Sequence, residues 1–440
     1  MIKLRPVLSV SVAVLITAAV VPAGSANAKK AAPSVSHIAY QQWNSGAEFA
    51  DGSALSGTAV NSAGDVVLSS PTGTFDYNDP FDNSIEATTY DVGTWTSREI
   101  IPGFNYTELV ASWNADTPAG TWIEVSVAGR ADNGTRSKSY VLGRWAEGDA
   151  EGDGKSTATI HRTSVPAQGD DLATVAVDTL VARSGRTLST WQLTVSLFRK
   201  SGSAATPSVS LVGAMASQLP EKTKRVPASP SGGAEGITLD VPTYSQEIHI
   251  GEYPVYNGGG EAWCSPTSTA MVLGYWDRGP TADDYSWVDP AYDDPWVDYA
   301  AANTYDYNYD GTGNWPFNTA YAGRYDLESF VTRLRSLTEA EQFIKAGIPL
   351  VVSISFKESE LDGAGYGTNG HLMVIVGFTE DGDVIANDPA SHLIESNDQV
   401  RTVYDREQFE NVWIPKSGGI AYVIHPTEVA LPSAPAEPNW

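Results

Sequence analysis

The residue best suited to covalent chemistry is Cys264, the only cysteine among 440 residues. It follows the glycine-rich turn Gly258-Gly-Gly and begins a run that predicts a helix to about Trp276, with Pro266 in its first turn. A thiol at a helix N-terminus lies at the positive end of the helix dipole, which favours the thiolate. The position therefore predicts a nucleophilic sulfur. The alternative is a buried cysteine that acts as a small hydrophobic residue.

A nucleophilic cysteine needs a base that takes its proton and a third group that orients the base. His371 stands where the polar, glycine-rich segment 357–370 meets an apolar run that ends at Phe378. Asp388 follows 17 residues later (388 − 371), and one hairpin can bring the two side chains together across neighbouring strands. We expect His371 to be the base and Asp388 to orient it. A hydrogen-bonded strand-edge histidine and an Asn-Asp-Pro turn are the alternatives.

Gln246 is the candidate for stabilising negative charge on a reacting oxygen. It ends the segment Leu239-Asp-Val-Pro-Thr-Tyr-Ser-Gln246, which we expect to be a short strand. Its amide and the backbone N–H of Cys264 would together form an oxyanion hole.

The first 28 residues predict a secretory signal peptide. Lys3 and Arg5 precede the apolar stretch 7–21, and Ser25-Ala-Asn-Ala28 is a small-residue cleavage site. The stretch is short for a membrane span, so we expect a secreted, extracellular protein without a stable membrane anchor. An uncleaved anchor is the alternative. Cleavage removes two of 27 basic residues and leaves 53 acidic ones, a net charge of −28, which argues against a nucleic-acid partner.

Residues 37–217 predict an all-β domain, a sandwich or jelly roll, because short apolar or alternating runs recur between turn signals. The expected strands are 65–68, 121–127, 139–142, 173–181, 190–198 and 209–212. The tryptophans of this region are expected in its core, with a sugar-stacking face as the alternative. They are Trp43, Trp95, Trp113, Trp122, Trp145 and Trp191. Residues 218–236 predict a linker and 426–440 a loose tail.

Residues 237–425 predict an α+β domain, a helix ahead of an antiparallel sheet. The acidic, aromatic segment 277–325 is expected to pack near the site. A helix is expected to begin at Asp326, because apolar residues recur at helical spacing, and another at the capping box of Thr338 and Glu341. The remaining expected elements are strands 348–356, 371–378, 383–388 and 419–424 and a helix at 406–413.

The acidic loop 283–310 ends in half of a calcium-binding pattern. Asp306-Tyr-Asn-Tyr-Asp-Gly311 matches the first half of an EF-hand loop, but Phe317 stands where the pattern needs glutamate. We expect a solvated acidic loop, with a calcium site as the alternative.

Four motifs in this order resemble the papain-fold cysteine peptidases related to the bacteriocin-leader peptidases, the family C thirty-nine-like group. They are Val241-Pro-Thr-Tyr-Ser-Gln246, Trp263-Cys-Ser-Pro-Thr-Ser-Thr-Ala-Met-Val-Leu273, Gly370-His-Leu-Met-Val-Ile-Val-Gly-Phe378 and Asn387-Asp-Pro389. The resemblance covers about 237–425 and implies a papain-like fold, a triad of Cys264, His371 and Asp388, and Gln246 ahead of it. The chain departs from the family in the 18-residue gap before Cys264 and in Ser265, where glycine is usual.

Together with the predicted signal peptide, the resemblance implies a secreted cysteine hydrolase that forms a thioester, a peptidase with a peptide or protein as its expected substrate, cell-wall peptides included. It implies no metal or organic cofactor. The acidic loop favours basic peptides as a hypothesis. Two alternatives stay open: a non-catalytic extracellular binding protein on the same scaffold, and a cell-wall- or carbohydrate-binding protein with amidase activity.

Overall fold

A computed structural model describes residues 35–51, 54–82, 86–148, 159–220 and 225–440. All of them fall within one compact unit. The predicted signal peptide, 1–28, lies outside the described residues. In the described part of the chain, no helix has the length and apolar character that a membrane crossing requires.

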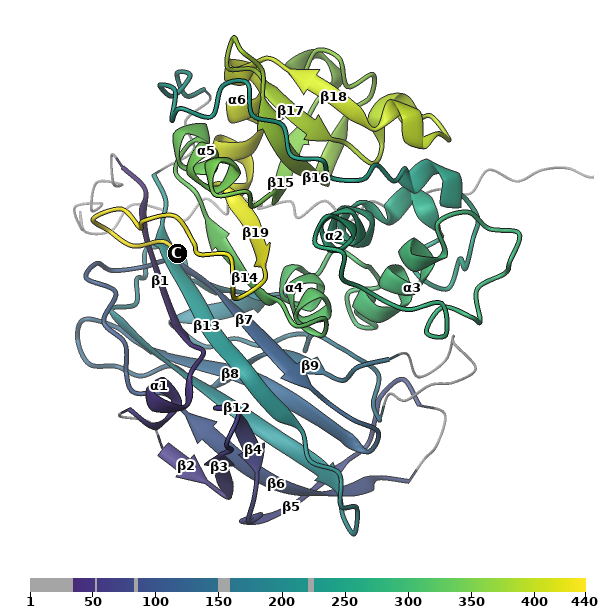
Figure 1. Cartoon of the computed structure of the whole chain (residues 1–440). Coiled ribbons are helices and arrows are strands. Elements are labelled where there is room, and N and C mark those ends of the chain that lie inside the picture. Colours follow the sequence, from purple (N-terminus) through teal and green to yellow (C-terminus); the bar gives the residue numbers. More distant parts are fainter. Residues whose placement is uncertain (1–34, 52–53, 83–85, 149–158, 221–224) are drawn as a thin grey trace, which may run out of the picture. The chain divides into compact units, whose positions relative to one another are not determined.

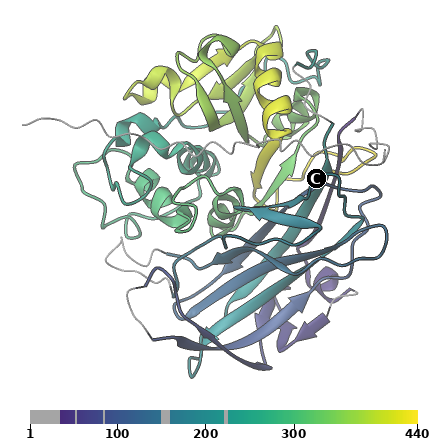
Figure 2. The ribbon, with the colours of Figure 1, turned by 180° about the vertical axis from the view of Figure 1, so that it is seen from behind.

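The N-terminal region is built from two antiparallel sheets, seen from two sides in Figures 1 and 2. One sheet has the order β10-β11-β7-β13-β4-β3, with β1 also paired to β13, and the other has the order β2-β6-β12-β8-β9, with β5 paired to β6. The all-β prediction is confirmed. The elements are β1 (His37–Trp43), α1 (Gly46–Ala50), β2 (Ala54–Ser56), β3 (Thr58–Val60), β4 (Val66–Leu68), β5 (Gly73–Tyr77), β6 (Thr88–Thr96), β7 (Glu108–Asp116), β8 (Thr121–Arg130), β9 (Tyr140–Trp145), β10 (Ala173–Ala176), β11 (Thr179–Ala182), β12 (Thr190–Lys200) and β13 (Ser208–Gln218).

All six tryptophans of this region are at most 2% exposed, so the core interpretation is confirmed and they form no sugar-stacking face. Their rings pack on other aromatic side chains. Trp122 stacks on Phe198 at 3.8 Å between centroids, and Trp43 meets Trp95 edge-on at 5.2 Å. Such pairs add to the stabilisation that comes from burying large apolar surfaces.

The expected single strand 173–181 is wrong, because the chain turns back at Val177 and Asp178. Val177 has a φ of 58°, a left-handed conformation that a β-branched residue rarely adopts. The result is a hairpin of β10 and β11, whose turn has a role at the site described below.

The C-terminal region is an α+β domain around one six-stranded antiparallel sheet, with the order β14-β19-β15-β16-β17-β18 (Figure 1). Its fold class is therefore the predicted one. Its elements are η1 (Gln246–His249), η2 (Gly260–Ala262), α2 (Cys264–Tyr275), α3 (Pro295–Thr304), α4 (Trp315–Gly323), β14 (Glu328–Arg333), α5 (Leu337–Lys345), β15 (Leu350–Phe356), η3 (Glu358–Glu360), β16 (Thr368–Phe378), β17 (Val384–Asn387), η4 (Ser391–Leu393), η5 (Asn397–Gln399), β18 (Arg401–Tyr404), α6 (Arg406–Ser417) and β19 (Ile420–His425).

Strand β16 is buried on both faces, which explains its continuous apolar run. Leu372 and Val374 belong to the core that contains helix α2. Met373 and Ile375 belong to the core beneath α5 and α6. Helices therefore cover both faces of the sheet, and the strand that carries His371 is held firmly in place.

The helix expected at Asp326 is wrong, because Glu328–Arg333 forms strand β14, paired with β19. Phe330 and Val331 belong to the two different cores, on opposite faces of the sheet. When both faces of a strand are buried, its apolar residues also satisfy helical spacing, so the periodicity misleads.

Three local expectations are also wrong. Leu239–Gln246 forms no strand of its own, and Gln246 begins the short helix η1 instead. Glu341 caps no helix terminus, because its Oε2 accepts from the backbone N–H groups of Gly232 and Ala234. The end of the chain is not loose: Asn439 is fully buried and its amide donates to the carbonyl of Arg333.

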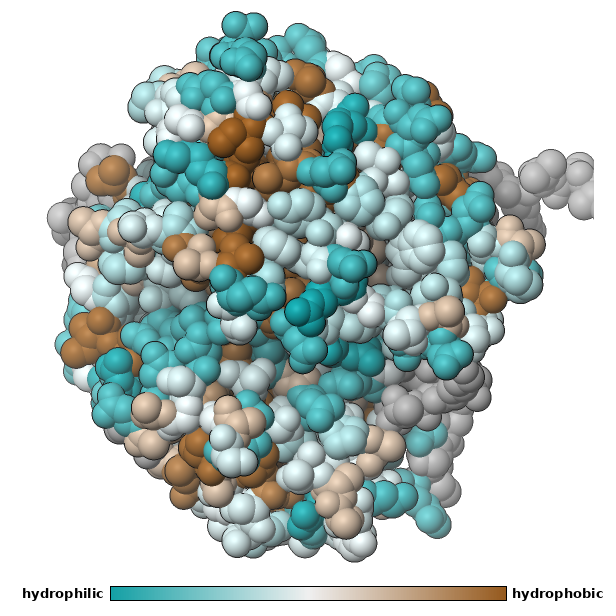
Figure 3. Space-filling model, in the orientation of Figure 1, coloured by the Kyte–Doolittle hydropathy of each residue, from teal (hydrophilic) through white to brown (hydrophobic). Residues whose placement is uncertain are grey.

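On the face shown in Figure 3, hydrophobic residues occur in small separate groups among hydrophilic ones. This face therefore shows no continuous apolar band.

Candidate functional site

Cys264 is the first residue of helix α2, and its side chain is partly exposed. The residue before it, Trp263, is fully buried, and its indole N–H donates to the carbonyl of Tyr256 at 2.7 Å. In the second turn of the helix, Ser268 donates to the carbonyl of Leu372 at 3.1 Å. The N-terminus of α2 is thus anchored on both sides, which leaves the sulfur in a defined position at the protein surface.

His371 and Asp388 meet across neighbouring strands, as the hairpin argument predicts. Asn387 on β17 pairs with Val374 on β16, so Asp388 comes to lie near the beginning of β16. The Nε2 atom of His371 is 2.8 Å from Oδ1 of Asp388, and both side chains are buried. The Asp388 carboxylate thereby takes one ring nitrogen and leaves Nδ1 for another partner.

The side chain of Cys264 lies close enough to the His371 ring to affect its pKa, and both residues line the same cavity. Burial lowers the pKa of His371, but the charge and hydrogen bond of Asp388, with the contact to Cys264, outweigh burial and raise the pKa to about 10. The imidazole is therefore stabilised in its charged form beside the sulfur.

Asp388 is fully buried and surrounded by donors. Its oxygens accept from the hydroxyl groups of Tyr366 at 3.0 Å and Tyr404 at 2.6 Å and from the backbone N–H of Ala390 at 3.0 Å. Burial raises the pKa of Asp388, but His371 and these donors together bring it below its usual value. The carboxylate is therefore held ionised in a fixed orientation.

Sequence reasoning did not identify Tyr366 and Tyr404 as part of the site. Neither lies in a recognisable motif, and β18, which carries Tyr404, was not expected at all. Only the pairing of β17 with β18 brings Tyr404 to the carboxylate.

Gln246 lies at the same site, in η1, and is 3% exposed. One amide N–H donates to the carbonyl of Glu261 at 2.8 Å, and its backbone N–H donates to the carbonyl of Pro389 at 2.9 Å. A side-chain amide carries two N–H donors, so one remains for a ligand. The 18-residue gap is closed by η1 and η2, which pack on each other.

Cys264, His371 and Gln246 line one cavity of about 850 Å³, with Asp388 behind His371. Tyr309 and Trp315 from the segment 277–325 also line this cavity, so the expectation that this segment packs near the site is confirmed. The cavity is large enough for several residues of an extended peptide.

The cavity continues into a second one of about 400 Å³, with which it shares Tyr309, Trp315 and Lys416. Its lining includes Val177 and Asp178, the turn between β10 and β11. The Oδ2 atom of Asp178 accepts from the backbone N–H of Trp315 at 3.0 Å. The N-terminal region therefore contributes to the wall of the groove.

The acidic loop is solvated only in part, because Asp310 at the end of the half calcium pattern is exposed whereas Asp306 is fully buried. Its Oδ1 accepts from the backbone N–H groups of Ser164, Asn308 and Tyr309, and its Oδ2 from the amide of Asn314. N–H donors occupy the oxygens that a calcium ion would need, so this carboxylate holds the loop together instead.

A cysteine at a helix N-terminus, beside a histidine that is paired with a carboxylate on an antiparallel sheet, is the arrangement of a papain-like α+β domain. Residues 238–420 match the family model described as Peptidase_C39 like family, and residues 39–217 match the model described as Peptidase C39 N-terminal domain. Residues 238–420 belong to the peptidase C39-like family, and a peptidase C39 N-terminal domain precedes them. The resemblance drawn from the four motifs is confirmed. This family membership indicates a cysteine peptidase.

The other comparisons add little. Among curated proteins none matches the chain. Solved structures of infectious bursal disease virus match with low similarity, each with a TM-score of 0.15. The structure of the Gx strain is 15% identical, and the match covers 46% of this chain and 54% of the viral chain. The structure of the VP2 subviral particle is 12% identical, and the match covers 42% of this chain and 53% of the viral chain. The match spans about half the length of those chains.

Proposed function

We propose that this protein is a secreted cysteine peptidase, with Cys264 as the nucleophile, His371 as the base, Asp388 as the residue that orients it and Gln246 as an oxyanion donor. The single observation that carries the proposal is that Cys264 lies beside a His371 ring that is hydrogen-bonded to the buried Asp388, at the wall of a peptide-sized cavity. Family membership supports peptide hydrolysis as the reaction.

The arrangement supports acyl transfer in two steps. The sulfur of Cys264 bonds to the carbonyl carbon while the carbonyl π electrons move to oxygen, where the second amide N–H of Gln246 and the backbone N–H of Cys264 stabilise the charge. His371 then gives its proton to the leaving nitrogen, the C–N bond breaks, and a thioester remains. His371 takes a proton from water, the hydroxide oxygen bonds to the same carbon, and the C–S bond breaks to release a carboxylic acid.

The walls of the cavity support a peptide substrate with apolar and basic side chains. Ile250, Tyr309 and Leu393 are large apolar residues that line the cavity and are between 44% and 58% exposed. The carboxyl groups that line it are those of Glu247 and Glu261, which come from outside the acidic loop. A basic substrate preference would therefore depend on these two residues, and basic cell-wall peptides are one class that carries such charges.

Secretion is proposed from the sequence of residues 1–28 alone. The test is N-terminal sequencing of protein recovered from the medium of cells that express the full chain. A mature N-terminus at Lys29 supports secretion, and retention of the whole chain inside the cell contradicts it.

The decisive experiment for the peptidase is labelling with a thiol-directed electrophile near pH 7, followed by peptide mapping. We expect rapid labelling of Cys264 in the unmodified chain and labelling at least about 100-fold slower in His371→Ala, because the imidazole stabilises the thiolate. Cys264→Ser is the control for other sites. If Cys264 is labelled at the same rate in the unmodified chain and in His371→Ala, and no peptide is cleaved, the proposal is contradicted. The function would then be that of a non-catalytic binding protein.

A further inference from the structure

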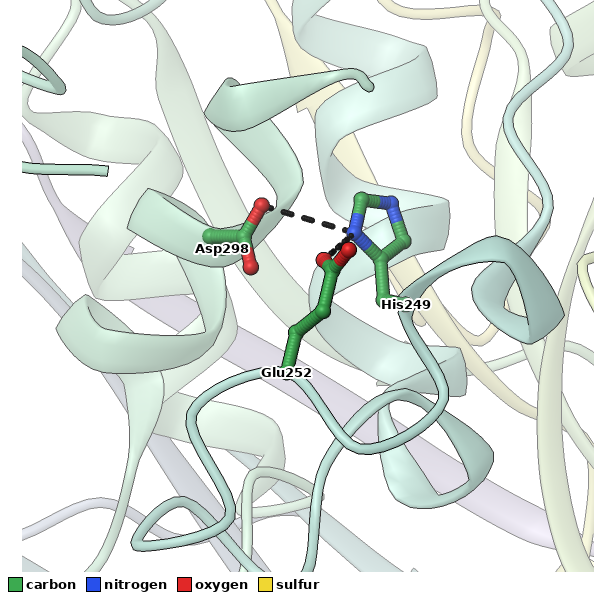
Figure 4. Close-up of side chains that lie close together, drawn as sticks. All are labelled: His249, Glu252 and Asp298. Atoms are coloured by element: carbon green, nitrogen blue, oxygen red, sulfur yellow. Dashed lines mark hydrogen bonds and ion pairs between the residues drawn. The ribbon is translucent and has the colours of Figure 1, made fainter. Parts of the chain in front are cut away.

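A second group of ionisable side chains lies beneath η1, outside the proposed triad. His249 ends η1, Glu252 follows it, and Asp298 is on α3. Figure 4 shows that both carboxylates converge on the same ring nitrogen of His249. The Nδ1 atom is 2.7 Å from Glu252 Oε2 and 3.4 Å from Asp298 Oδ2. Among the described residues, this is the one group of three or more such side chains whose donor atoms are close enough to share an ion.

The three side chains are buried, between 0% and 7% exposed, and their charges do not balance. His249 Nδ1 carries at most one hydrogen, and the short contact to Glu252 uses it. Both oxygens of Asp298 then lack a hydrogen-bond donor although the residue is fully buried. A buried carboxylate without a donor or cation is strongly unfavourable.

We propose that His249, Glu252 and Asp298 bind a divalent transition-metal cation, zinc by preference. Two carboxylates and one neutral imidazole supply a charge of −2, which a divalent cation neutralises where a single shared proton does not. The cation replaces the missing donor on Asp298 and satisfies all three side chains together.

The donor set favours zinc over calcium, because calcium takes oxygen ligands and zinc accepts imidazole nitrogen together with carboxylate oxygen. Ligand atoms at about 2.0–2.1 Å from a tetrahedral zinc lie about 3.3 Å from one another. The contact from His249 to Asp298 already has this length, and the contact from His249 to Glu252 is about 0.6 Å shorter. A water molecule would complete the coordination.

The proposed ion is structural rather than catalytic, since none of its three ligands lines the cavity that contains Cys264. It would tie η1, which begins with Gln246, to helix α3. The His249 ring also lies 5.9 Å from the ring of Trp263, the residue before Cys264. Insofar as Gln246 acts as the proposed function requires, the ion would also hold the oxyanion donor in place.

The test uses the full chain with Cys264→Ala, because this substitution removes a thiol that could bind zinc on its own. After EDTA treatment and gel filtration, ZnCl₂ is added, excess metal is removed, and bound zinc and the melting temperature are measured. We expect one zinc per chain and a melting temperature about 5 °C higher at a large excess of ZnCl₂ over its dissociation constant. Since this variant has no nucleophile, the result does not depend on peptidase activity.

The matched variants add Asp298→Asn, Glu252→Gln or Asp79→Asn to Cys264→Ala. Asp79 pairs with His161 at 3.0 Å in the N-terminal region, so its substitution controls for loss of a histidine–carboxylate pair elsewhere. Zinc and the temperature shift should disappear in the first two variants and persist in the third. If Asp298→Asn does not fold, Glu252→Gln decides the outcome.

A spectrum of Co²⁺ added to the EDTA-treated Cys264→Ala chain gives a measurement that needs no further substitution. A tetrahedral Co²⁺ band that disappears on addition of ZnCl₂ supports the site. The proposal is overturned if Cys264→Ala binds no zinc and shows neither temperature shift nor Co²⁺ band. Equal zinc binding in all three double variants also overturns it, because the metal then lies elsewhere.

Discussion

Ser268 on helix α2 donates a hydrogen bond of 3.1 Å to the carbonyl of Leu372, the residue after His371. The helix that begins with the sulfur is thus joined directly to the strand that carries the imidazole. Ser268 is fully buried, so no water replaces this bond when it is lost.

Ser268→Ala should therefore lower the free energy of unfolding by about 1–2 kcal/mol, because a buried carbonyl loses its donor. It should also slow labelling of Cys264 by about 10-fold, since a small shift between helix and strand lengthens the contact to His371. Chemical denaturation and labelling kinetics measure the two effects. Ser268→Thr keeps the hydroxyl donor and is the control. Labelling at the unmodified rate in Ser268→Ala would show that this bond does not position the pair.

Asp388→Asn should shift the pH dependence of peptide hydrolysis. With Asp388 in place, the pKa of His371 is about 10, so imidazolium persists from neutral to alkaline pH and the rate should fall only as the pH passes about 10. Without the carboxylate, burial dominates, the pKa of His371 falls, and the alkaline limb moves to lower pH. We also expect the rate to fall about 10²–10⁴-fold. If the fall in rate at alkaline pH occurs at the same pH in Asp388→Asn, a group other than His371 causes it.

The same pair should make stability depend on pH with a definite sign. The folded-state pKa of His371 is raised above its ordinary value, so its contribution to stability is full below about pH 6.5 and is lost as the pH rises through about 10. Denaturant unfolding of the full chain at pH 6, 8 and 10 measures this loss. In His371→Gln the loss over this range should be smaller, and an equal loss would attribute it to other groups.

Gln246→Ala should lower kcat about 10²–10³-fold and leave the rate of thiol alkylation nearly unchanged. The reason is that an oxyanion donor acts on the tetrahedral intermediate, which alkylation does not form. Gln246→Glu, which has a similar size but lacks the donor, separates the donor from its packing and should be equally impaired in hydrolysis. If both variants lose alkylation as well, Gln246 supports the structure of the site instead.

Glu261→Gln should reduce any preference for basic peptides, because Glu261 is an exposed carboxylate on the cavity wall. We expect cleavage of a Lys-containing peptide to fall about 5-fold relative to its Gln counterpart and to become less sensitive to salt. The control is Asp293→Asn, an exposed carboxyl group of the acidic loop that does not line the cavity. If both variants change the ratio of Lys-peptide to Gln-peptide cleavage equally, the overall charge of the protein sets the preference rather than Glu261 on the cavity wall.

Much of the candidate site is visible in the sequence because its chemistry is carried by scarce residue types next to strong local signals. Cys264 is unique and begins a helix, and His371 begins the apolar part of strand β16, whose hairpin partner β17 ends just before Asp388. The expected strands 65–68 and 348–356 likewise correspond to β4 and β15, since alternating or continuous apolar runs between turn residues reflect local backbone preferences.

The parts of the fold and of the site that the sequence did not predict depend on long-range packing. Helical spacing relates Leu327, Phe330, Val331 and Leu334, yet pairing with β19 makes Glu328–Arg333 a strand. Tyr366 and Tyr404 have no local signature, and only the folded sheet brings their hydroxyl groups to Asp388. His249 and Asp298 lie 49 residues apart (298 − 249), and no local pattern joins an imidazole to a carboxylate on a separate helix. The local sequence specifies which groups can react and which segments favour a helix or a strand. The burial of each group and the partners that set its pKa arise only when distant segments pack together.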